Sequence, residues 1–219
     1  ISVIDEYPRG RQKIATYCVD SSYRNRVYNY IKKFLDEGRQ AYIVCPLVEE
    51  NETLDITSAT EYYENLKDGD FKNYSVGLLH GKMKPKQKDE VMRDFSDGKI
   101  QLLIATTVIE VGIDVPNAVV MLIENAERFG LSQLHQLRGR VGRGVRKSYC
   151  VFVSDAINKN GTARERLMTV KNSHDGYAIA EKDLAMRGPG DFLAMRGDGY
   201  LRQSGGVRFK LAELCDDTG

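Results

Sequence analysis

The sequence predicts an α/β fold in which a parallel sheet is flanked by helices. Up to about residue 155, short apolar runs alternate with segments of helical periodicity. Strands that alternate with helices in this way are typical of parallel sheets. A chain of 219 residues, of which 42% are hydrophobic, can bury one ordinary core and carry a smaller appendage. Six strands are expected, over residues 13–19, 41–45, 75–79, 101–105, 119–123 and 148–153.

The first helix is expected between the first two strands. It follows Asp20 and Ser21 and stops at Gly38, since glycine commonly ends a helix. Its predicted apolar stripe consists of Tyr23, Val27, Ile31 and Phe34.

Two further helices are expected before the fourth strand. Ser58 with Glu61 three residues later reads as a capping box, which predicts that the second helix begins at Ser58. The third helix is expected to begin at Pro85, a residue favoured in the first turn, and to end before Gly98. The apolar face of the third helix is formed by Val91, Met92 and Phe95.

The alternation of strands and helices stops after about residue 155. Residues 162–187 are expected to be helical, whereas the segment from Gly188 to Gly206 is too rich in glycine to form a packed element. The chain is therefore predicted to consist of a sheet domain followed by a carboxy-terminal appendage.

Bulk composition does not identify a partner, because the formal net charge is only +1. Acidic residues predominate over residues 46–70 and basic residues over 128–171, so one face or edge is expected to be positive.

The four cysteines form no C-x-x-C pair and are interpreted as small hydrophobes in a reduced compartment. No apolar run approaches the ~18 residues of a membrane span and no signal peptide opens the chain, so we expect a cytoplasmic protein with no membrane partner. The histidines His135 and His174 lack partners at metal-ligand spacing, so no metal site is expected.

A glycine-punctuated turn carries two arginines three residues apart, Arg140 and Arg143. Arginine is always charged and presents a planar fork to phosphate oxygens, whereas glycine leaves room for a ligand or another domain to approach. The pair therefore indicates nucleotide chemistry, although these residues alone would also suit a solvated basic loop. A dinucleotide fingerprint is disfavoured, because the glycines are spaced G-x-x-G-x-G and follow a helical pattern instead of a strand. That pattern consists of Leu131, Leu134, Leu137 and Val141.

This turn and the segment 102–118 together resemble motifs VI and V of superfamily 2 helicases. The segment begins as a buried strand, L-L-I-A, and breaks into a polar loop. Motif VI of that family, Q-x-x-G-R-x-G-R, is matched by Gln136, Gly139, Arg140, Gly142 and Arg143. Motif V is matched by Thr107, Gly112 and Asp114. The resemblance implies a RecA-like parallel sheet.

The tail resembles the translocation motif of the RecG DNA helicases. It reads D-L-A-M-R-G-P-G-D-F over residues 183–192 and R-Q-S-G over 202–205. The residues that carry the likeness are Arg187, Gly188, Gly190 and Gln203. Residues 194–201 lengthen the passage between the two parts beyond the family pattern, so transfer of the role to Gln203 is the less secure step. The resemblance implies three parts: a linker over 1–12, a RecA-like domain over 13–155, and a helical hairpin with the tail over 156–219.

The resemblance also implies a role for each matched group. Arg140 and Arg143 would stabilise charge on the γ-phosphate of ATP, and Gln136 would help to position them. The predicted nucleotide-facing residues are Gly112, Asp114, Gly139 and Gly142. The predicted nucleic-acid contacts are His80, Gly81, Lys82, Thr106 and Thr107. Taken alone, Thr106 and Thr107 would be interpreted as strand-end caps and Asp114 as a turn residue. Lys82 would be interpreted as part of a solvated helix start.

The sequence contains no G-x-x-x-x-G-K-[ST] phosphate loop and no run that would hold Mg²⁺. By resemblance, ATP and Mg²⁺ would be bound mainly by a first motor lobe outside this chain. The chain would be the second lobe of a double-stranded DNA translocase that remodels branched DNA in repair and recombination. Its partners would be branched DNA, the first lobe, and an N-terminal DNA-binding domain of the same protein. Alone, it would be catalytically inactive. Two alternatives stay open: a lobe of a transcription-coupled repair translocase, and a non-catalytic interaction domain of helicase ancestry.

Overall fold

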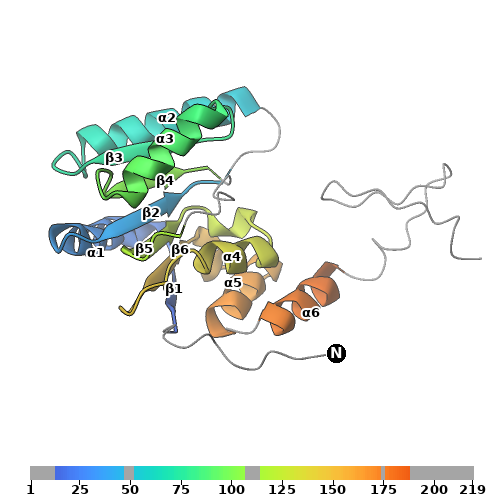
Figure 1. Cartoon of the computed structure of the whole chain (residues 1–219). Coiled ribbons are helices and arrows are strands. Elements are labelled where there is room, and N and C mark those ends of the chain that lie inside the picture. Colours follow the sequence, from blue (N-terminus) through green and yellow to red (C-terminus); the bar gives the residue numbers. More distant parts are fainter. Residues whose placement is uncertain (1–12, 47–51, 107–113, 174–175, 188–219) are drawn as a thin grey trace, which may run out of the picture.

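The computed structural model describes residues 13–46, 52–106, 114–173 and 176–187 (Figure 1). Within them, six strands form one sheet in the order β1-β6-β5-β2-β4-β3, and every neighbouring pair is parallel. All six expected strands are confirmed. Their bounds are Ala15–Val19 (β1), Gln40–Val44 (β2), Val76–Leu79 (β3), Leu102–Ala105 (β4), Ala118–Ile123 (β5) and Tyr149–Val153 (β6).

The central strands are buried on both faces, as their unbroken apolar sequences require. All residues of β2, β4 and β5 are buried. Successive residues of β2, β4 and β6 alternate between two separate cores, one on each side of the sheet. In β6, for example, Cys150 and Phe152 belong to one core, and Val151 and Val153 belong to the other.

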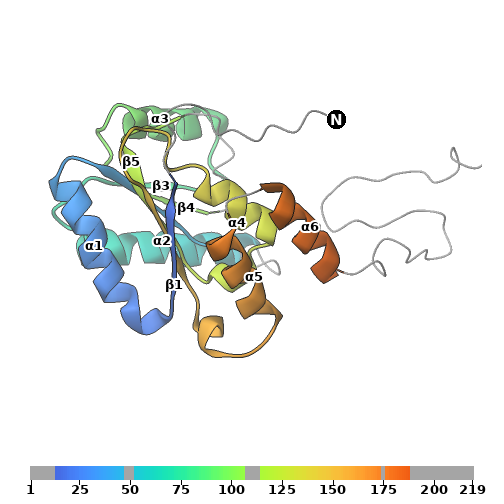
Figure 2. The ribbon, with the colours of Figure 1, turned by 90° about the horizontal axis from the view of Figure 1, so that it is seen from below.

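The helices form a layer on each side of the sheet. Helices α1 (Arg24–Asp36) and α2 (Glu52–Asp68) contribute to one core, and α3 (Pro85–Ser96), α4 (Leu131–Arg138) and α5 (Thr162–Asn172) contribute to the other. Helix α6 (Gly176–Arg187) packs against α4 and α5, so that it lies on the outside of that layer, far from α1 (Figures 1 and 2). Three short 3₁₀ turns are Ser21–Tyr23, Ala126–Arg128 and Asp155–Asn158. Within the described residues, no helix combines the length and apolar character needed to cross a membrane.

Helix α1 lies where it was expected, but its predicted apolar stripe was partly wrong. Tyr23 is exposed and Phe34 is only half-buried, whereas Tyr28 and Leu35 are buried. The reason is that Tyr23 belongs to a 3₁₀ turn that precedes the α-helix, so it lies out of register with the buried face. Phe34 packs sideways, with its ring centroid 5.1 Å from that of Tyr30.

The predicted start of α2 at Ser58 was wrong, because the helix begins at Glu52 and places Ser58 in its interior. No glycine or proline lies between these positions to stop the helix from extending. Helix α3 begins at Pro85 and ends at Ser96, as expected. The helical stretch 162–187 consists of two helices, because Ser173 adopts an extended conformation after α5.

Candidate functional site

The first group of predicted site residues lies at the carboxyl ends of β3 and β4. Leu79 and Ala105 are register partners at the ends of these strands, and His80 and Thr106 follow them directly. The Thr106 amide donates a hydrogen bond of 3.0 Å to the Leu79 carbonyl. Thr106 is buried, and within the described part of the chain neither its hydroxyl nor Nδ1 of His80 has a hydrogen-bond partner. Two polar atoms therefore lie together at this edge, where parallel sheets commonly bind ligands.

The loop that leaves β3 is strongly positive. Burial, followed by the charges of Lys88 and Lys82, lowers the pKa of His80 below its ordinary value, so the neutral imidazole is favoured. Lys88 Nζ donates to the carbonyl of Gly81 at 2.6 Å and closes the loop. Lys82 and Gly81 are both exposed. The amino end of α3 follows immediately, and a helix amino terminus beside lysines favours an anion.

The second group lies in the turn that follows α4. Gly142 has φ of +77°, a conformation that side chains rarely adopt. Arg143 Nε donates to the carbonyl of Gly139 at 3.2 Å and lies 3.6 Å from a carboxylate oxygen of Asp114. The Arg143 side chain is 34% exposed and that of Asp114 is 51% exposed. The structure thus brings together the ends of the two segments that carry the helicase resemblance.

The backbones of these two segments also touch. A Cβ atom on Gly144 would lie 2.8 Å from the carbonyl oxygen of Pro116, so only glycine permits the approach. Pro116 and Asn117 directly precede β5, and Asn117 Nδ2 donates to the carbonyl of Gly38 at 3.0 Å, just before β2 begins. The contact of Gly144 with Pro116 therefore lies near the amino end of β5, whereas His80 and Thr106 lie at the carboxyl ends of β3 and β4.

Tyr42 of β2 lies close to both arginines of the turn. It is buried, and burial raises the pKa of its hydroxyl, while the charges of Arg140 and Arg143 oppose that rise. Arg140 is half-buried, and Gln136 is exposed on α4. The two arginines thus extend from a turn anchored on the buried residue Val141.

The remaining predicted positions lie at or beyond the borders of the described residues. Thr107 and Gly112, which would join the two groups, lie outside them. Arg187 is the last residue of α6 and the last described residue. Gly188, Gly190 and Gln203 lie outside the described residues. In the described ranges, no cluster of three or more His, Cys, Asp or Glu residues could hold a metal ion.

Arg138 has no role in the sequence motifs, but it is buried between α4 and the α5–α6 pair. Its guanidinium donates to the backbone carbonyls of Val170 and Ser173, the latter at 2.9 Å, and contacts Nδ1 of His135 at 2.9 Å. These carbonyls lie at the carboxyl end of α5, where a cation is favoured. The only sequence signal was an arginine directly after the buried residue Leu137.

A second network that was not anticipated surrounds Glu124, at the carboxyl end of β5. The buried carboxylate accepts two hydrogen bonds of 3.0 Å from Arg24 and one of 3.0 Å from the Tyr62 hydroxyl. Tyr28 and Tyr62 share a hydrogen bond of 2.6 Å, and the Tyr28 hydroxyl lies 3.4 Å from the same carboxylate. The hydrogen bonds from Arg24 to Glu124 raise the pKa of that guanidinium further above its ordinary value. The network ties α1 and α2 to the sheet.

The fold and the arginine-bearing turn are those of a RecA-like domain of the helicase class. Residues 25–145 match the helicase conserved C-terminal domain. The chain belongs to this family, and it is a C-terminal helicase domain of the RecG type.

The individual comparisons agree with this assignment. The chain is 48% identical over 217 residues to the ATP-dependent DNA helicase RecG of Bacillus subtilis, which is 99% of this chain and 31% of that protein. The corresponding identity to RecG of Thermotoga maritima is 46%, over 99% of this chain and 27% of that protein. The chain therefore spans less than a third of the length of these curated relatives.

Solved structures give the same result. The structure of RecG bound to a three-way DNA junction matches with a TM-score of 0.71 and 46% identity, over 86% of this chain and 24% of that chain. The C-terminal domain of Dbp5 from Saccharomyces cerevisiae matches with a TM-score of 0.51 and 18% identity, over 79% of this chain and 99% of that chain. At this identity, the second match shows the fold alone.

Proposed function

We propose that this chain is the second motor domain of an ATP-dependent DNA helicase that remodels branched DNA in repair and recombination. The relatives are named ATP-dependent DNA helicases, and the RecG structure that matches is bound to a three-way junction. The observation that carries the proposal is the arginine turn with its glycine-dependent contact to Pro116. That contact joins the two segments that carry the helicase resemblance.

In this proposal, Arg140 and Arg143 act on nucleotide bound mainly by another domain. Hydrolysis moves charge onto the γ-phosphate oxygens, and an arginine held nearby stabilises that charge most strongly in the transition state. Arg143 is suited to this role because it is partly exposed and its carboxylate neighbour lies at 3.6 Å, a loose contact that phosphate can replace. Gln136 and Asp114, together with Gly112, Gly139 and Gly142, would line the same nucleotide. Mg²⁺ would neutralise the phosphates from the other lobe.

The opposite end of the sheet would contact DNA. The buried hydroxyl of Thr106 and the neutral imidazole of His80 can bond to backbone phosphate. The loop from Gly81 to α3 adds lysines and a helix amino terminus, both of which attract phosphate. Thr107 would extend the contact. Separate nucleotide and DNA sites on one rigid sheet would allow this domain to transmit the nucleotide state to the DNA.

The tail would convert the change in nucleotide state into movement along DNA. Helices α5 and α6 are held to α4 by Arg138 and by a hydrogen bond of 3.1 Å from Ser132 to Asp183. Because α4 leads directly into the arginine turn, a shift of that turn would be transmitted to α6 and Arg187. Gly188, Gly190 and Gln203 would then act on DNA beyond α6. Coupling of this kind requires an element with two arrangements that the nucleotide state can bias.

The test is the substitution Arg143→Ala in the full-length protein that contains this chain. We expect the turnover number for ATP to fall by about 10³ to 10⁵, the contribution typical of an arginine finger, while ATP and DNA binding are retained. Arg143→Lys should not restore turnover, because an ammonium lacks the planar fork. Arg146→Ala is the matched control, since Arg146 is exposed just beyond the turn. Wild-type turnover in Arg143→Ala would make the turn purely structural.

A further inference from the structure

One side of the sheet is incompletely covered. On this side, α1 packs mainly on β2 and β5, and α2 packs on β3. Helix α5 packs on β1 from the opposite side. Among the described residues, α1 reaches β6 through ring contacts to Tyr149, the first residue of that strand. All-parallel sheets normally have both faces covered, so the face of β1 that carries the exposed Tyr17 is one that another element is expected to cover.

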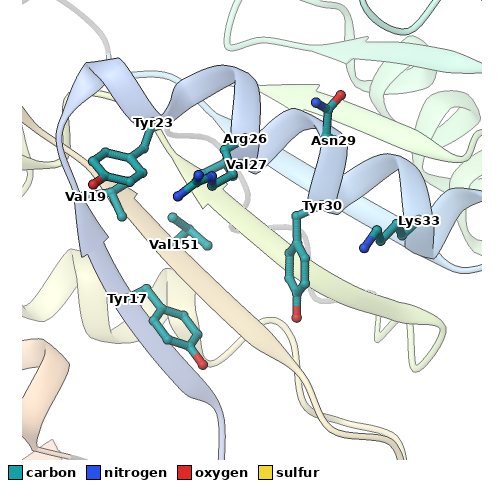
Figure 3. Close-up of a pocket in the computed structure, with 9 residues that line it drawn as sticks. All are labelled: Tyr17, Val19, Tyr23, Arg26, Val27, Asn29, Tyr30, Lys33 and Val151. Atoms are coloured by element: carbon teal, nitrogen blue, oxygen red, sulfur yellow. The ribbon is translucent and has the colours of Figure 1, made fainter.

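The uncovered face forms a groove between α1 and the strands β1 and β6, shown in Figure 3. It encloses about 350 Å³. Tyr17 is 48% exposed and Tyr23 is 44% exposed. The lining residues are Tyr17, Val19, Tyr23, Arg26, Val27, Asn29, Tyr30, Lys33 and Val151.

The groove floor follows from the alternation of side chains along β1, where every second residue faces the groove. In β1, Tyr17 and Val19 point toward the groove, while Cys18 points to the opposite side, where its thiol contacts the Leu167 carbonyl of α5 at 3.8 Å. Val151 of β6 continues the apolar floor. The exposed part of the groove floor thus lies on the edge strand β1, because Val151 of β6 is already buried in the core that α1 helps to form.

The rim of the groove is positive. Arg26 and Lys33 are the charged residues that line it, and Lys147 lies close by, with Nζ 5.7 Å from the Tyr149 ring centroid. Arg26 lies over the Tyr23 ring, with Cζ 5.5 Å from the centroid. The lining contains no acidic side chain. A matching surface would therefore be apolar at its centre and acidic at its edges.

We propose that this groove docks an amphipathic, acidic segment of the same polypeptide that lies outside these 219 residues. The inference rests on the proposed function, in which the chain is one domain of a longer helicase. The relatives have ample chain to supply such a segment, because this chain covers only 31% of the Bacillus subtilis protein. A symmetric contact with a second copy is disfavoured, since it would bring the basic rims of two copies together. DNA would satisfy the cations but would cover the apolar floor only while bound.

The experiment is photo-cross-linking in the full-length protein, with Tyr17 replaced by p-benzoylphenylalanine. We expect an intramolecular cross-link to a peptide outside this chain, rich in Asp or Glu and apolar residues, identified by mass spectrometry. The same replacement at Lys72 is the control, because Lys72 is exposed near β3 at the other edge of the sheet. Cross-links confined to residues 1–219, cross-links between copies or to added DNA, or no cross-link at all would overturn the inference.

Two further measurements complete the test. Lys33→Glu in the cross-linking protein should reduce the yield of the cross-link, and Lys33→Arg should retain it; an unchanged yield in Lys33→Glu would refute the electrostatic part. DNA-stimulated ATP hydrolysis is measured on the same preparations. A protein that hydrolyses ATP normally but gives no outside cross-link overturns the docking inference alone. A protein without this activity before any replacement overturns the proposed function.

Discussion

Substitution of Arg24 by alanine measures how strongly the Glu124 network holds α1 to the sheet. The change removes two hydrogen bonds of 3.0 Å and leaves a carboxylate whose side chain is 4% exposed. The Tyr62 hydroxyl, at 3.0 Å, stays as a donor to that carboxylate.

The magnitude follows from these contacts. Breaking a buried ion pair by removing one partner costs about 3–5 kcal/mol. The value here should be smaller, because the Arg24 side chain is 36% exposed, water can enter its place and the tyrosine donor is retained. We therefore expect a loss of about 2–3 kcal/mol in the free energy of unfolding, which lies within the range of about 1.5–3 kcal/mol for hydrogen bonds to a charged group. For a chain of this size, that corresponds to a melting temperature lower by roughly 4–12 °C.

The assay is thermal and urea unfolding of the 219-residue chain, followed by circular dichroism. Arg26→Ala is the matched control on the same helix; Arg26 is exposed and stacks on Tyr23, so its loss should cost less than about 1 kcal/mol. A double-mutant cycle with Glu124→Gln should give a coupling energy of roughly 1–3 kcal/mol. If Arg24→Ala were no more destabilising than Arg26→Ala, the reasoning about the buried carboxylate would be refuted.

Three further predictions concern reactivity, pH and coupling. Burial raises the pKa of Cys18 to about 11 and that of Cys45 to about 12. Iodoacetamide at pH 8 should therefore label both thiols far more slowly in the native chain than in the unfolded chain. Equal labelling rates, measured by mass spectrometry, would contradict the burial of these thiols. The folded pKa of His80 is lowered from its ordinary 6.5, so the unfolded chain binds this proton first, and stability should fall as pH drops below about 6.5. His80→Gln should flatten that part of the unfolding profile measured without DNA, and an unchanged profile would show that His80 does not contribute to it. In the full-length protein, Arg187→Ala should retain much of the DNA-stimulated ATP hydrolysis and lose fork unwinding; equal loss of both, with a lower melting temperature, would reduce the tail to packing.

The strands could be predicted from the sequence because a short, unbroken run of apolar residues by itself indicates a buried strand. Runs such as A-V-V-M-L-I of β5 have no polar position to disturb them. The start of α2 could not be predicted in the same way. Ser58 and Glu61 match a capping pattern, but nothing at this position breaks the helix that begins at Glu52. A local capping preference is worth about 1 kcal/mol, which an uninterrupted helix easily overrides.

The candidate site shows the same division. The arginine turn could be recognised because its glycines and arginines are contiguous in sequence. The contact of Gly144 with Pro116 joins residues far apart in the chain, and no local pattern encodes it. The partners of Glu124 are more distant still, with Arg24 separated from it by 100 residues. A lone acidic residue after an apolar strand was the available signal.

The pairing of β1 with β6 affects the order in which this domain can fold during its synthesis. β1 is the first described strand along the chain, yet it lies at the sheet edge and its only described neighbour is β6, the last one. During synthesis, strands β2 to β5 can associate as soon as they emerge, whereas β1 must wait until residue 153 leaves the ribosome. Such non-local pairings fold slowly. A nascent chain stopped between β5 and β6 would expose β1 as an unpaired strand with Tyr17, an attractive binding site for a chaperone.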